Sequence, residues 1–483
     1  MKKFHIVLLS LTLAAVLCVT GLSLFGKDPT FSASENRKLA QRPKFTLSSL
    51  LDGSFISAFE AYYSDTFPGR EKMLELNRSL NKFYYYSGAS EEDSVLVIGG
   101  STGAENGGES LHDVQKEQEA LSRADAPDDT ASADEQKPET PATEQSPDTP
   151  AVPDTPEAPA EEPPHIDTPD ESEATYAGNV VVVGTRAMEI PTASDDLVVR
   201  YAGAVNNLAA ALGSEVRTFS LVTPNGGEFY SPESMHEGLH SQKAMIDLCY
   251  ENLQSGVTPV DAYSALAQHV DEYLYFRTDH HWTQLGAYYA YTKFCEAAGF
   301  EAEPLDAFET GEYTNFVGSM YTFTSGYPQS QILKDNPDTL TYYLPIYETH
   351  AKYYADATLQ NGVPISVVYT KLADETTNKY LCFIGGDTPI CVIESAAEGG
   401  VCMVLKESYG NAFVPFLTSH YSKIIVVDPR EFNRDGKPSL DLAAFAKEQG
   451  VDDLLVINYP YTVNSVSYIN WLNRLVGKDP NWQ

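Results

Sequence analysis

Short, continuously apolar runs alternate with helical patterns along the chain, and this alternation constrains the fold most strongly. The runs are expected to be strands, and they cover residues 94–99, 179–184, 215–222, 274–276, 400–405, 423–428 and 453–458. The helical patterns cover residues 44–86, 197–212, 241–255, 283–298 and 440–449. Apolar strands alternating with helices are typical of a mostly parallel sheet covered on both faces. We therefore expect an α/β fold whose ligands bind beyond the carboxyl ends of the strands.

An acidic, proline-rich stretch interrupts this pattern. Residues 101–175 hold 21 acidic residues against 3 basic ones, and the net charge of the whole chain is -36. Such a segment has too little apolar surface to offset its chain entropy, so we expect a disordered insert between two neighbouring strands. The folded remainder is moderately acidic. It lacks the basic face that nucleic-acid binding needs, so we expect no nucleic-acid partner.

The N-terminus has the composition of a membrane anchor. Met1-Lys2-Lys3 is followed by an apolar run from Phe4 to Phe25. About 20 apolar residues span a bilayer as a helix, and lysines before the run favour a cytoplasmic N-terminus. We expect an uncleaved, single-pass anchor with the rest of the chain outside the cell membrane; secretion after signal cleavage is the alternative. The predicted units are the anchor (1–27), a helical part with the first strand (28–100), the insert (101–175) and the main domain (176–483).

Two polar segments lie where expected strands meet expected helices. In Arg277-Thr278-Asp279-His280-His281-Trp282-Thr283 an aspartate stands two residues before a histidine. A carboxylate at this spacing can hold an imidazole in one tautomer and stabilise its protonated form. Farther along the chain, Ser408 follows an apolar run and precedes a helical pattern. A serine at such a turn presents its hydroxyl at the sheet edge, where N–H groups of the helix start can stabilise an oxyanion. The segments predict that Ser408, His281 and Asp279 form a relay.

These segments also carry a family resemblance. Asp279-His280-His281-Trp282 resembles the signature of the DHHW protein family and, more broadly, the Asp-x-His-Trp block of the alginate O-acetyltransferase-like branch of SGNH hydrolases. Glu407-Ser408-Tyr409 is similar to the serine block of that branch, with a glutamate in place of the common aspartate. Residues 34–40 and 63–70 resemble the N-terminal segment of the same proteins. The resemblance implies an SGNH-hydrolase-like three-layer α/β/α domain and acyl-ester chemistry that needs no cofactor.

Three neighbouring residues are candidates for substrate contact. His280 would point away from His281 in an extended segment, and we assign it a structural or substrate-facing role. Trp282 is interpreted as a packing residue that fixes the loop, with stacking on a sugar as the alternative. Asn411 could assist the oxyanion site or cap the helix. Asp279, His280 and His281 could instead bind a metal, but no further ligand pattern completes a zinc site, so we predict no metal.

With the resemblance, these features favour a membrane-tethered, extracytoplasmic enzyme that transfers or removes O-acetyl groups on a cell-envelope polysaccharide. Ser408 would be the nucleophile, His281 its base, and Asp279 would orient His281. A transferase outside the membrane would need a membrane protein to supply the acyl group. The alternative is a non-catalytic envelope scaffold or glycan-binding protein that retained the fold.

Overall fold

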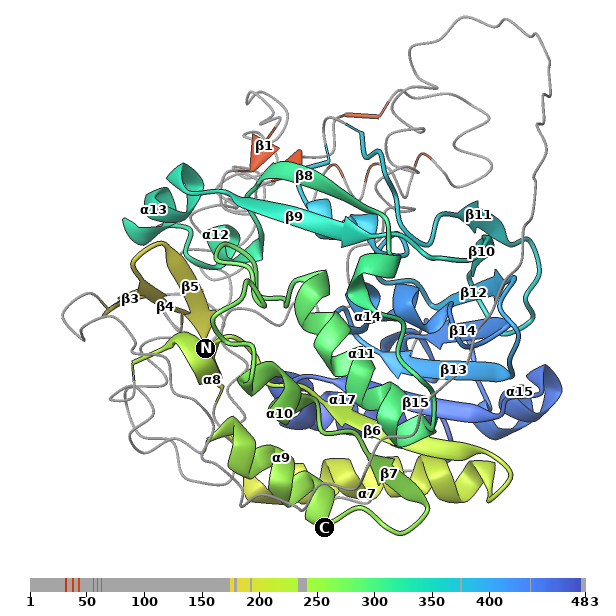
Figure 1. The fold of residues 1–483 in the computed structure, drawn as a ribbon. Coiled ribbons are helices and arrows are strands. Elements are labelled where there is room, and N and C mark those ends of the chain that lie inside the picture. The colour runs from red at the N-terminus through yellow and green to blue at the C-terminus, as the bar shows by residue number, and fades with distance from the viewer. Residues whose placement is uncertain are drawn as a thin grey trace, which may run out of the picture.

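A large mixed sheet forms the centre of the computed structural model (Figure 1). The structure describes residues 174–478 except 178–179, 192, 233–240, 374–375 and 435, together with a few positions between residues 31 and 62. The sheet is 8-stranded, and its strands follow the order β11-β10-β12-β14-β13-β15-β6-β7. Their bounds are β6 Arg217–Val222, β7 Val257–Pro259, β10 Thr349–Tyr354, β11 Val363–Ile365, β12 Ile390–Ser395, β13 Val401–Lys406, β14 Lys423–Val427 and β15 Asp453–Asn458.

Four of the strands predicted from apolar runs, β14, β13, β15 and β6, form most of the parallel part of this sheet. They run parallel in that order, followed by β7, which was not predicted, and the interior positions of β13, β14 and β15 are buried. The antiparallel edge formed by β12, β10 and β11 was not predicted. β10 and β11 are partly exposed, so their sequences lack the continuous apolar run that marks a fully buried strand.

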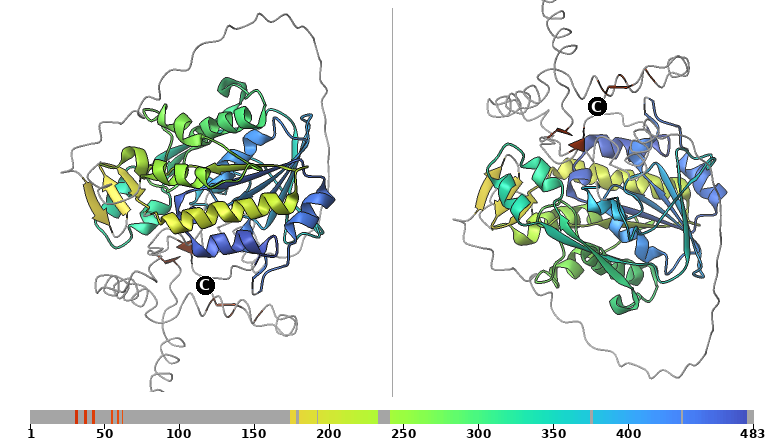
Figure 2. Two further views of the ribbon diagram at one scale, coloured as in Figure 1. Left: turned by 90° about the horizontal axis from the view of Figure 1, so that it is seen from below. Right: turned by 90° about the horizontal axis from the view of Figure 1, so that it is seen from above.

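Helices lie on both faces of the sheet (Figure 2). α7 packs against α17 and α15 on one face, whereas α11 packs against α10 and α14 on the other. The predicted helices at 197–212, 241–255, 283–298 and 440–449 are present as α7, α9, α11 and α15. The helix bounds are α7 Asp195–Leu212, α8 Gly227–Tyr230, α9 Gln242–Glu251, α10 Ala262–Ala267, α11 Gln284–Ala298, α12 Ser319–Phe323, α13 Gln329–Asp335, α14 Gly410–Leu417, α15 Leu442–Gln449, α16 Pro460–Val463 and α17 Val466–Arg474.

Besides the pair of short strands β1 (Phe31–Ser32) and β2 (Arg37–Lys38), two small antiparallel sheets lie outside the central one. β3 (Ala174–Ala177), β4 (Val180–Val183) and β5 (Arg186–Glu189) form the first, and β8 (Thr310–Phe316) pairs with β9 (Asp338–Tyr343) in the second. The apolar run at 179–184 is therefore a strand, but it does not join the central sheet as predicted. β4 lies beside α12 and α13 (Figure 1). Val180 and Val182 on one face of β4 pack on Met320 and Leu333 of these helices, which buries them without a neighbour in the central sheet.

The predicted strand at Leu274–Phe276 is wrong. Tyr275 and Trp282 form an isolated antiparallel bridge, and the Phe276 N–H donates to the His281 carbonyl over 3.3 Å. The residues between them therefore form a bent loop rather than an extension of a strand. These apolar residues are buried in a turn, and an apolar run alone cannot distinguish that environment from a strand.

Several expectations fall on the N-terminal part of the chain. The anchor over residues 1–27, the strand at 94–99 and most of the insert lie outside the described residues. Thr175, the last residue of the predicted insert, belongs to β3. In the described part of the chain, no helix combines the length and the apolar character needed to cross a bilayer.

Candidate active site

Asp279, His281 and Ser408 form a continuous chain of hydrogen bonds. Asp279 Oδ1 lies 2.6 Å from His281 Nδ1, and His281 Nε2 lies 2.8 Å from Ser408 Oγ. Ser408 follows the last residue of β13 by two positions, which places it at the carboxyl edge of the parallel strands. Asp279 and His281 are buried, whereas Ser408 is partly exposed. The predicted contact between the serine and the histidine is therefore present, with the hydroxyl at the accessible end.

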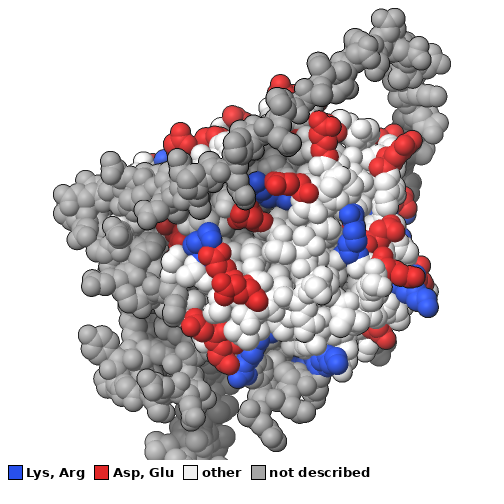
Figure 3. Space-filling view, turned by 60° about the horizontal axis from the view of Figure 1, so that its bottom comes forward, with Lys and Arg blue, Asp and Glu red and all other residues white. Residues whose placement is uncertain are grey.

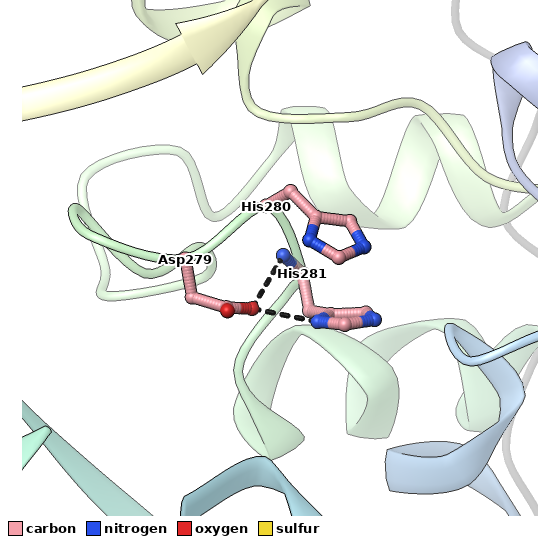
Figure 4. Close-up of side chains that lie close together, drawn as sticks. All are labelled: Asp279, His280 and His281. Carbon is pink, nitrogen blue, oxygen red and sulfur yellow. Dashed lines mark hydrogen bonds and ion pairs between the residues drawn. The ribbon is translucent and has the colours of Figure 1, made fainter. Parts of the chain in front are cut away.

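The surroundings of Asp279 favour its ionised form. Oδ1 also accepts a hydrogen bond from the His281 N–H at 3.0 Å (Figure 4). Oδ2 accepts from the Ser319 N–H at 2.9 Å. Burial alone raises the pKa of Asp279, but His281, His280 and the Ser319 N–H outweigh burial and hold that pKa below its usual range. Gly318 permits the close approach, because a Cβ there would lie 2.5 Å from Oδ2.

A second buried carboxylate, Asp338, fixes the segment that we call the Asp-His loop (residues 277–282). Asp338 stands at the start of β9 and accepts hydrogen bonds from the Thr278 N–H at 2.8 Å and the Thr278 hydroxyl at 2.6 Å. It also forms an ion pair with Arg277 at 3.1 Å and accepts from the Tyr273 hydroxyl. This role was not predictable from the sequence, because Asp338 lies far from the motif and belongs to no recognisable pattern.

Trp282 and Tyr409 tie the Asp-His loop to the serine turn (residues 407–409). Trp282 Nε1 donates to the Tyr409 carbonyl at 2.9 Å, and the Tyr409 hydroxyl donates to the His280 carbonyl. The indole is fully buried and lies parallel to the Phe413 ring. A fully buried ring cannot stack on a sugar, so that alternative for Trp282 is corrected. Trp282 packs the two halves of the site together, as its other interpretation predicted.

His280 does not point away from His281. The centroids of the two rings are 3.7 Å apart, and both imidazoles lie on the same side of the loop (Figure 4). The prediction assumed an extended segment, whereas the loop is bent. His280 Nδ1 lies 2.6 Å from Ser319 Oγ. Burial and the neighbouring His281 lower the pKa of His280 to about 3, against the opposing effect of Asp279, so this imidazole is neutral near pH 7.

Tyr380 holds the His281 ring from the other side. The two rings are stacked at 3.9 Å between centroids with an interplanar angle of 7°, and the Tyr380 hydroxyl donates to the Ser408 carbonyl at 3.2 Å. Tyr380 thereby contacts both halves of the hydrogen-bonded chain and restricts the imidazole to one plane. Sequence reasoning missed it, because it is one of 30 tyrosines and lies in a short 3₁₀ segment without a motif.

Glu407 is the acidic residue of the serine turn. Its Oε2 accepts from the Tyr409 N–H at 2.9 Å and lies 3.5 Å from Ser408 Oγ. Its Oε1 is buried and has no hydrogen-bond partner among the described residues. Burial raises the pKa of Glu407 to about 7, and the Tyr409 N–H only partly offsets this effect. Glu407 is therefore largely protonated below neutral pH.

A buried cluster of charges supports the serine turn from behind. Lys406 Nζ and Asn411 Nδ2 both donate to Asp387 Oδ1, at 2.7 and 3.0 Å. Arg430 binds Asp387 and Asp428. Asn411 is 1% exposed, so its side chain belongs to this network and not to a substrate-facing surface. The predicted substrate contact of Asn411 is corrected accordingly.

A pocket lies beside the two imidazoles. It is lined by residues of four segments: β5, the turn after β6, the Asp-His loop with the two residues before it, and α12. The lining includes Asp279, His280, His281, Glu189, Asn225, Gly226 and Gly227. On the surrounding surface, the face drawn in Figure 3 has charged side chains of both signs interspersed, and it shows no continuous basic patch of the kind that nucleic-acid binding needs. The pocket thus lies next to both imidazoles.

The same loop offers three potential metal ligands. Within the described residues, Asp279, His280 and His281 each present one ligand atom, and these atoms lie within 4.8 Å of one another. His281 Nδ1 and Nε2 are already paired with Asp279 and Ser408, and His280 Nδ1 is paired with Ser319. The hydrogen-bond pattern therefore corresponds to a relay, and a metal ion would have to replace several of these bonds.

Comparisons with known proteins agree with the resemblance of the motif. The family model described as DHHW protein matches residues 35–427. A crystal structure of a DHHW family protein from Eubacterium siraeum is 31% identical and covers 64% of this chain and 98% of that chain, with a TM-score of 0.54. PatB1 from Bacillus cereus with a sulfonyl adduct is 18% identical, covering 60% of this chain and 97% of that chain, with a TM-score of 0.48. No curated protein matches the chain.

A third similar structure is the O-acetyltransferase domain of Pseudomonas putida AlgJ. It is 17% identical and covers 62% of this chain and 98% of that chain, with a TM-score of 0.35. The likenesses to PatB1 and AlgJ are too distant to inform the function. The match to the family model is different, because it spans most of the sequence and includes both the Asp-His loop and Ser408. On this evidence the chain belongs to the DHHW family.

Proposed function

We propose that this chain is a serine-dependent acyl enzyme that transfers or removes O-acetyl groups on a cell-envelope polysaccharide. The observation that carries the proposal is the unbroken chain Asp279–His281–Ser408, with distances of 2.6 and 2.8 Å. A serine hydroxyl is a poor nucleophile unless a base accepts its proton, and an imidazole oriented by a carboxylate supplies that base. An SGNH-like arrangement, with helices on both faces of the sheet and the serine at its carboxyl edge, fits this proposal.

In the first half-reaction Ser408 Oγ attacks the acetyl carbonyl carbon while His281 Nε2 takes the hydroxyl proton. The imidazolium is stabilised by Asp279, which stays ionised because Ser319 and His281 donate to it. When the tetrahedral intermediate collapses, the bond to the leaving alcohol breaks and His281 returns the proton to that oxygen. The products are acetyl-Ser408 and the free alcohol.

In the second half-reaction the same groups act in reverse order. An acceptor hydroxyl or a water loses its proton to His281 Nε2, and its oxygen attacks the acetyl carbon. The bond to Ser408 Oγ then breaks, and the serine oxygen regains the proton. Transfer and hydrolysis differ only in which oxygen attacks, so exclusion of water from the pocket decides between them.

The oxyanion of each intermediate needs N–H donors. The Tyr409 N–H donates to Glu407 Oε2, and the Gly410 and Asn411 N–H groups donate to the carbonyls of Glu407 and Ser408. The start of α14 is therefore not the donor set that the sequence suggested. The N–H of Ser408 itself, which lies beyond the end of β13, is the donor that we assign to the oxyanion.

The location and the acyl source belong to the same proposal. The apolar run before residue 27 would anchor the chain in the cell membrane with the site on the outer side. A membrane protein would then deliver the acetyl group to Ser408. This arrangement suits an acceptor polysaccharide in the envelope.

The test is acetyl-ester turnover by the purified full-length chain, with p-nitrophenyl acetate as the donor. We expect a burst of p-nitrophenol followed by slow turnover, and no burst from the Ser408→Ala variant. Ser325→Ala, which alters a serine outside the site, should behave as the wild-type protein. A folded wild-type protein without a burst would instead favour a non-catalytic, glycan-binding role.

A further inference from the structure

Three polar groups that line the pocket have no hydrogen-bond partner among the residues that the structure describes. Glu189 is only 3% exposed at the end of β5, and neither of its carboxyl oxygens has a hydrogen-bond partner in the described part of the chain. The same is true, within that part, of the side-chain N–H groups of Asn225 and of Nε2 of His280. Buried polar groups are normally paired. Glu189 and Asn225 are buried and His280 is partly exposed, so these three groups are available to a ligand that enters the pocket.

The alternation of side chains along β5 turns Glu189 towards the pocket. Ala187 belongs to the face of β5 that packs on Met320, and Glu189 stands two positions later on the same face. Met188 lies on the opposite face, against Tyr230. The Ala187 N–H donates to the Arg277 carbonyl at 2.9 Å, which holds β5 against the Asp-His loop. Glu189 is thereby aimed at the side of the loop that carries the two imidazoles.

Asn225 forms the opposite wall in a fixed orientation. Its Oδ1 accepts from the Gly227 N–H and from Gln242 Nε2, both at 2.9 Å. With the oxygen held in this way, the amide N–H groups are the part of the side chain left for a ligand. Arg186 also lines the pocket, but its Nη1 donates to the carbonyl of Tyr275 at 2.9 Å.

The chemistry of the pocket suits a neutral ligand with hydroxyl groups. Burial raises the pKa of Glu189 to about 8, and the charge of Asp279 adds to this effect, so the carboxyl is protonated near pH 7. His280 is neutral at the same pH. A carboxyl, an amide and a neutral imidazole offer both donors and acceptors, as a hydroxyl does. An anionic ligand would instead place a second charge beside Asp279.

We propose that Glu189, with Asn225 and His280, binds the hydroxyl group of the acceptor, a neutral sugar or polyol, next to His281. The inference rests on the proposed function, because it assigns the acceptor site of the same reaction. The His280 and His281 rings are 3.7 Å apart, and His281 Nε2 is 2.8 Å from Ser408 Oγ. The pocket therefore adjoins the imidazole that contacts Ser408 and would deprotonate the acceptor.

The experiment measures how acetyl-Ser408 partitions between water and glycerol, a small neutral polyol. The full-length protein is acetylated with p-nitrophenyl acetate in increasing glycerol up to molar concentration, and glyceryl acetate and free acetate are quantified. The burst of p-nitrophenol counts the active sites of each sample, so transfer is expressed per acetylated site. Glu189→Leu removes the polar group at similar volume, and Glu189→Gln keeps a donor. Glu301→Gln changes an exposed residue and serves as the control.

We expect Glu189→Leu to lower transfer to glycerol at least about tenfold per acetylated site, which is the effect of losing one buried hydrogen bond to a ligand. Glu189→Gln should stay within about threefold of the wild-type protein, because its amide can still donate. Equal transfer by Glu189→Leu and the wild-type protein would overturn the inference. So would an acetylated wild-type protein that forms no glyceryl acetate. A wild-type protein without a burst would refute the proposed function itself, which is a separate result.

Discussion

The two segments that meet at the site each place a buried carboxylate beside a member of the hydrogen-bonded chain, but with opposite consequences. In the Asp-His loop, both oxygens of Asp279 accept hydrogen bonds, and its pKa lies below the usual range. In the serine turn, one oxygen of Glu407 has no described partner, and burial raises its pKa to about 7. Both side chains are almost fully buried, so the difference comes mainly from His281, whose charge and hydrogen bond lower the pKa of Asp279.

The comparison explains why a glutamate is tolerated before Ser408. The acid that orients His281 is Asp279, and it comes from a different segment of the chain. Glu407 Oε2 is engaged by the Tyr409 N–H and is 3.5 Å from Ser408 Oγ, so its main contact shapes the turn. A longer acidic side chain at this position therefore leaves the relay intact.

Removal of the imidazole should have the largest effect. His281→Ala leaves Ser408 without a base, and we expect acetyl-ester turnover to fall by roughly 10⁵- to 10⁶-fold, as for other serine nucleophiles that lose their histidine. His350→Ala, at an exposed position, is the matched control and should be unchanged. Turnover by His281→Ala near the wild-type rate would remove the Asp-His loop from the mechanism.

Substitutions of the two acids, Asp279 and Glu407, should differ clearly in their effect on turnover. Asp279→Asn keeps the shape but removes the anion that orients and stabilises the imidazole, so we expect turnover to fall by roughly 10⁴-fold with the fold retained. Glu407→Gln should change turnover by less than about tenfold, because Glu407 lies outside the relay and its main contact is with the Tyr409 N–H. Steady-state rates and circular dichroism of both variants measure the contrast. Equal losses would show that the two carboxylates act together.

His280→Ala should have an intermediate effect. The variant removes a ring that lies 3.7 Å from His281 and a hydrogen bond to Ser319, but no bond of the relay. We expect turnover to fall by about tenfold, with a larger rise in KM for the acceptor than fall in kcat. If His280→Ala were inactive and His281→Ala only mildly affected, the base would be His280 and the assignment of His281 would be wrong.

The raised pKa of Glu407 should make the stability of the protein depend on pH. Its pKa is about 7 in the folded protein against an ordinary value of 4.5, so its contribution to the unfolding free energy is complete below pH 4.5 and is lost as the pH rises to about 7. The unfolding free energy of Glu407→Gln, relative to that of the wild-type protein, should therefore increase by ~3 kcal/mol between pH 4.5 and about pH 7. Denaturant unfolding of both proteins at several pH values measures this gain. A difference that does not vary with pH would show that Glu407 has an unperturbed pKa.

A metal chelator should have the smallest effect. The relay uses His281 through both of its ring nitrogens, so we expect EDTA to leave turnover within about twofold. Restoration of activity by zinc after dialysis against EDTA would instead assign the Asp279, His280 and His281 cluster to a metal ion.

The part of the site that could be predicted is the part marked by local sequence patterns. Asp279 and His281 are two residues apart, and Ser408 follows a strand whose apolar run is unmistakable, so sequence reasoning could assign their contact. The orientation of His280 was missed, because the loop is bent by hydrogen bonds to Asp338, which is distant in the chain.

Two other residues of the site could not be predicted from the sequence for a similar reason. Tyr380 and Glu189 are common residue types in segments without a motif, and they reach the site only through the packing of distant elements. The fold shows the same division. The buried parallel strands were predicted from their apolar runs, whereas the partly exposed antiparallel edge and the separate β3-β4-β5 sheet depend on tertiary contacts.

Covalent labelling tests the central claim most directly. The full-length protein is treated with a serine-reactive phosphonate, digested, and analysed by mass spectrometry to locate the adduct. If His281 activates Ser408, the adduct will be found on Ser408 in the wild-type protein and will be absent from folded His281→Ala protein. A folded wild-type protein with no adduct on Ser408, or equal labelling in the two proteins, would contradict the assignment of Ser408 as a nucleophile activated by His281.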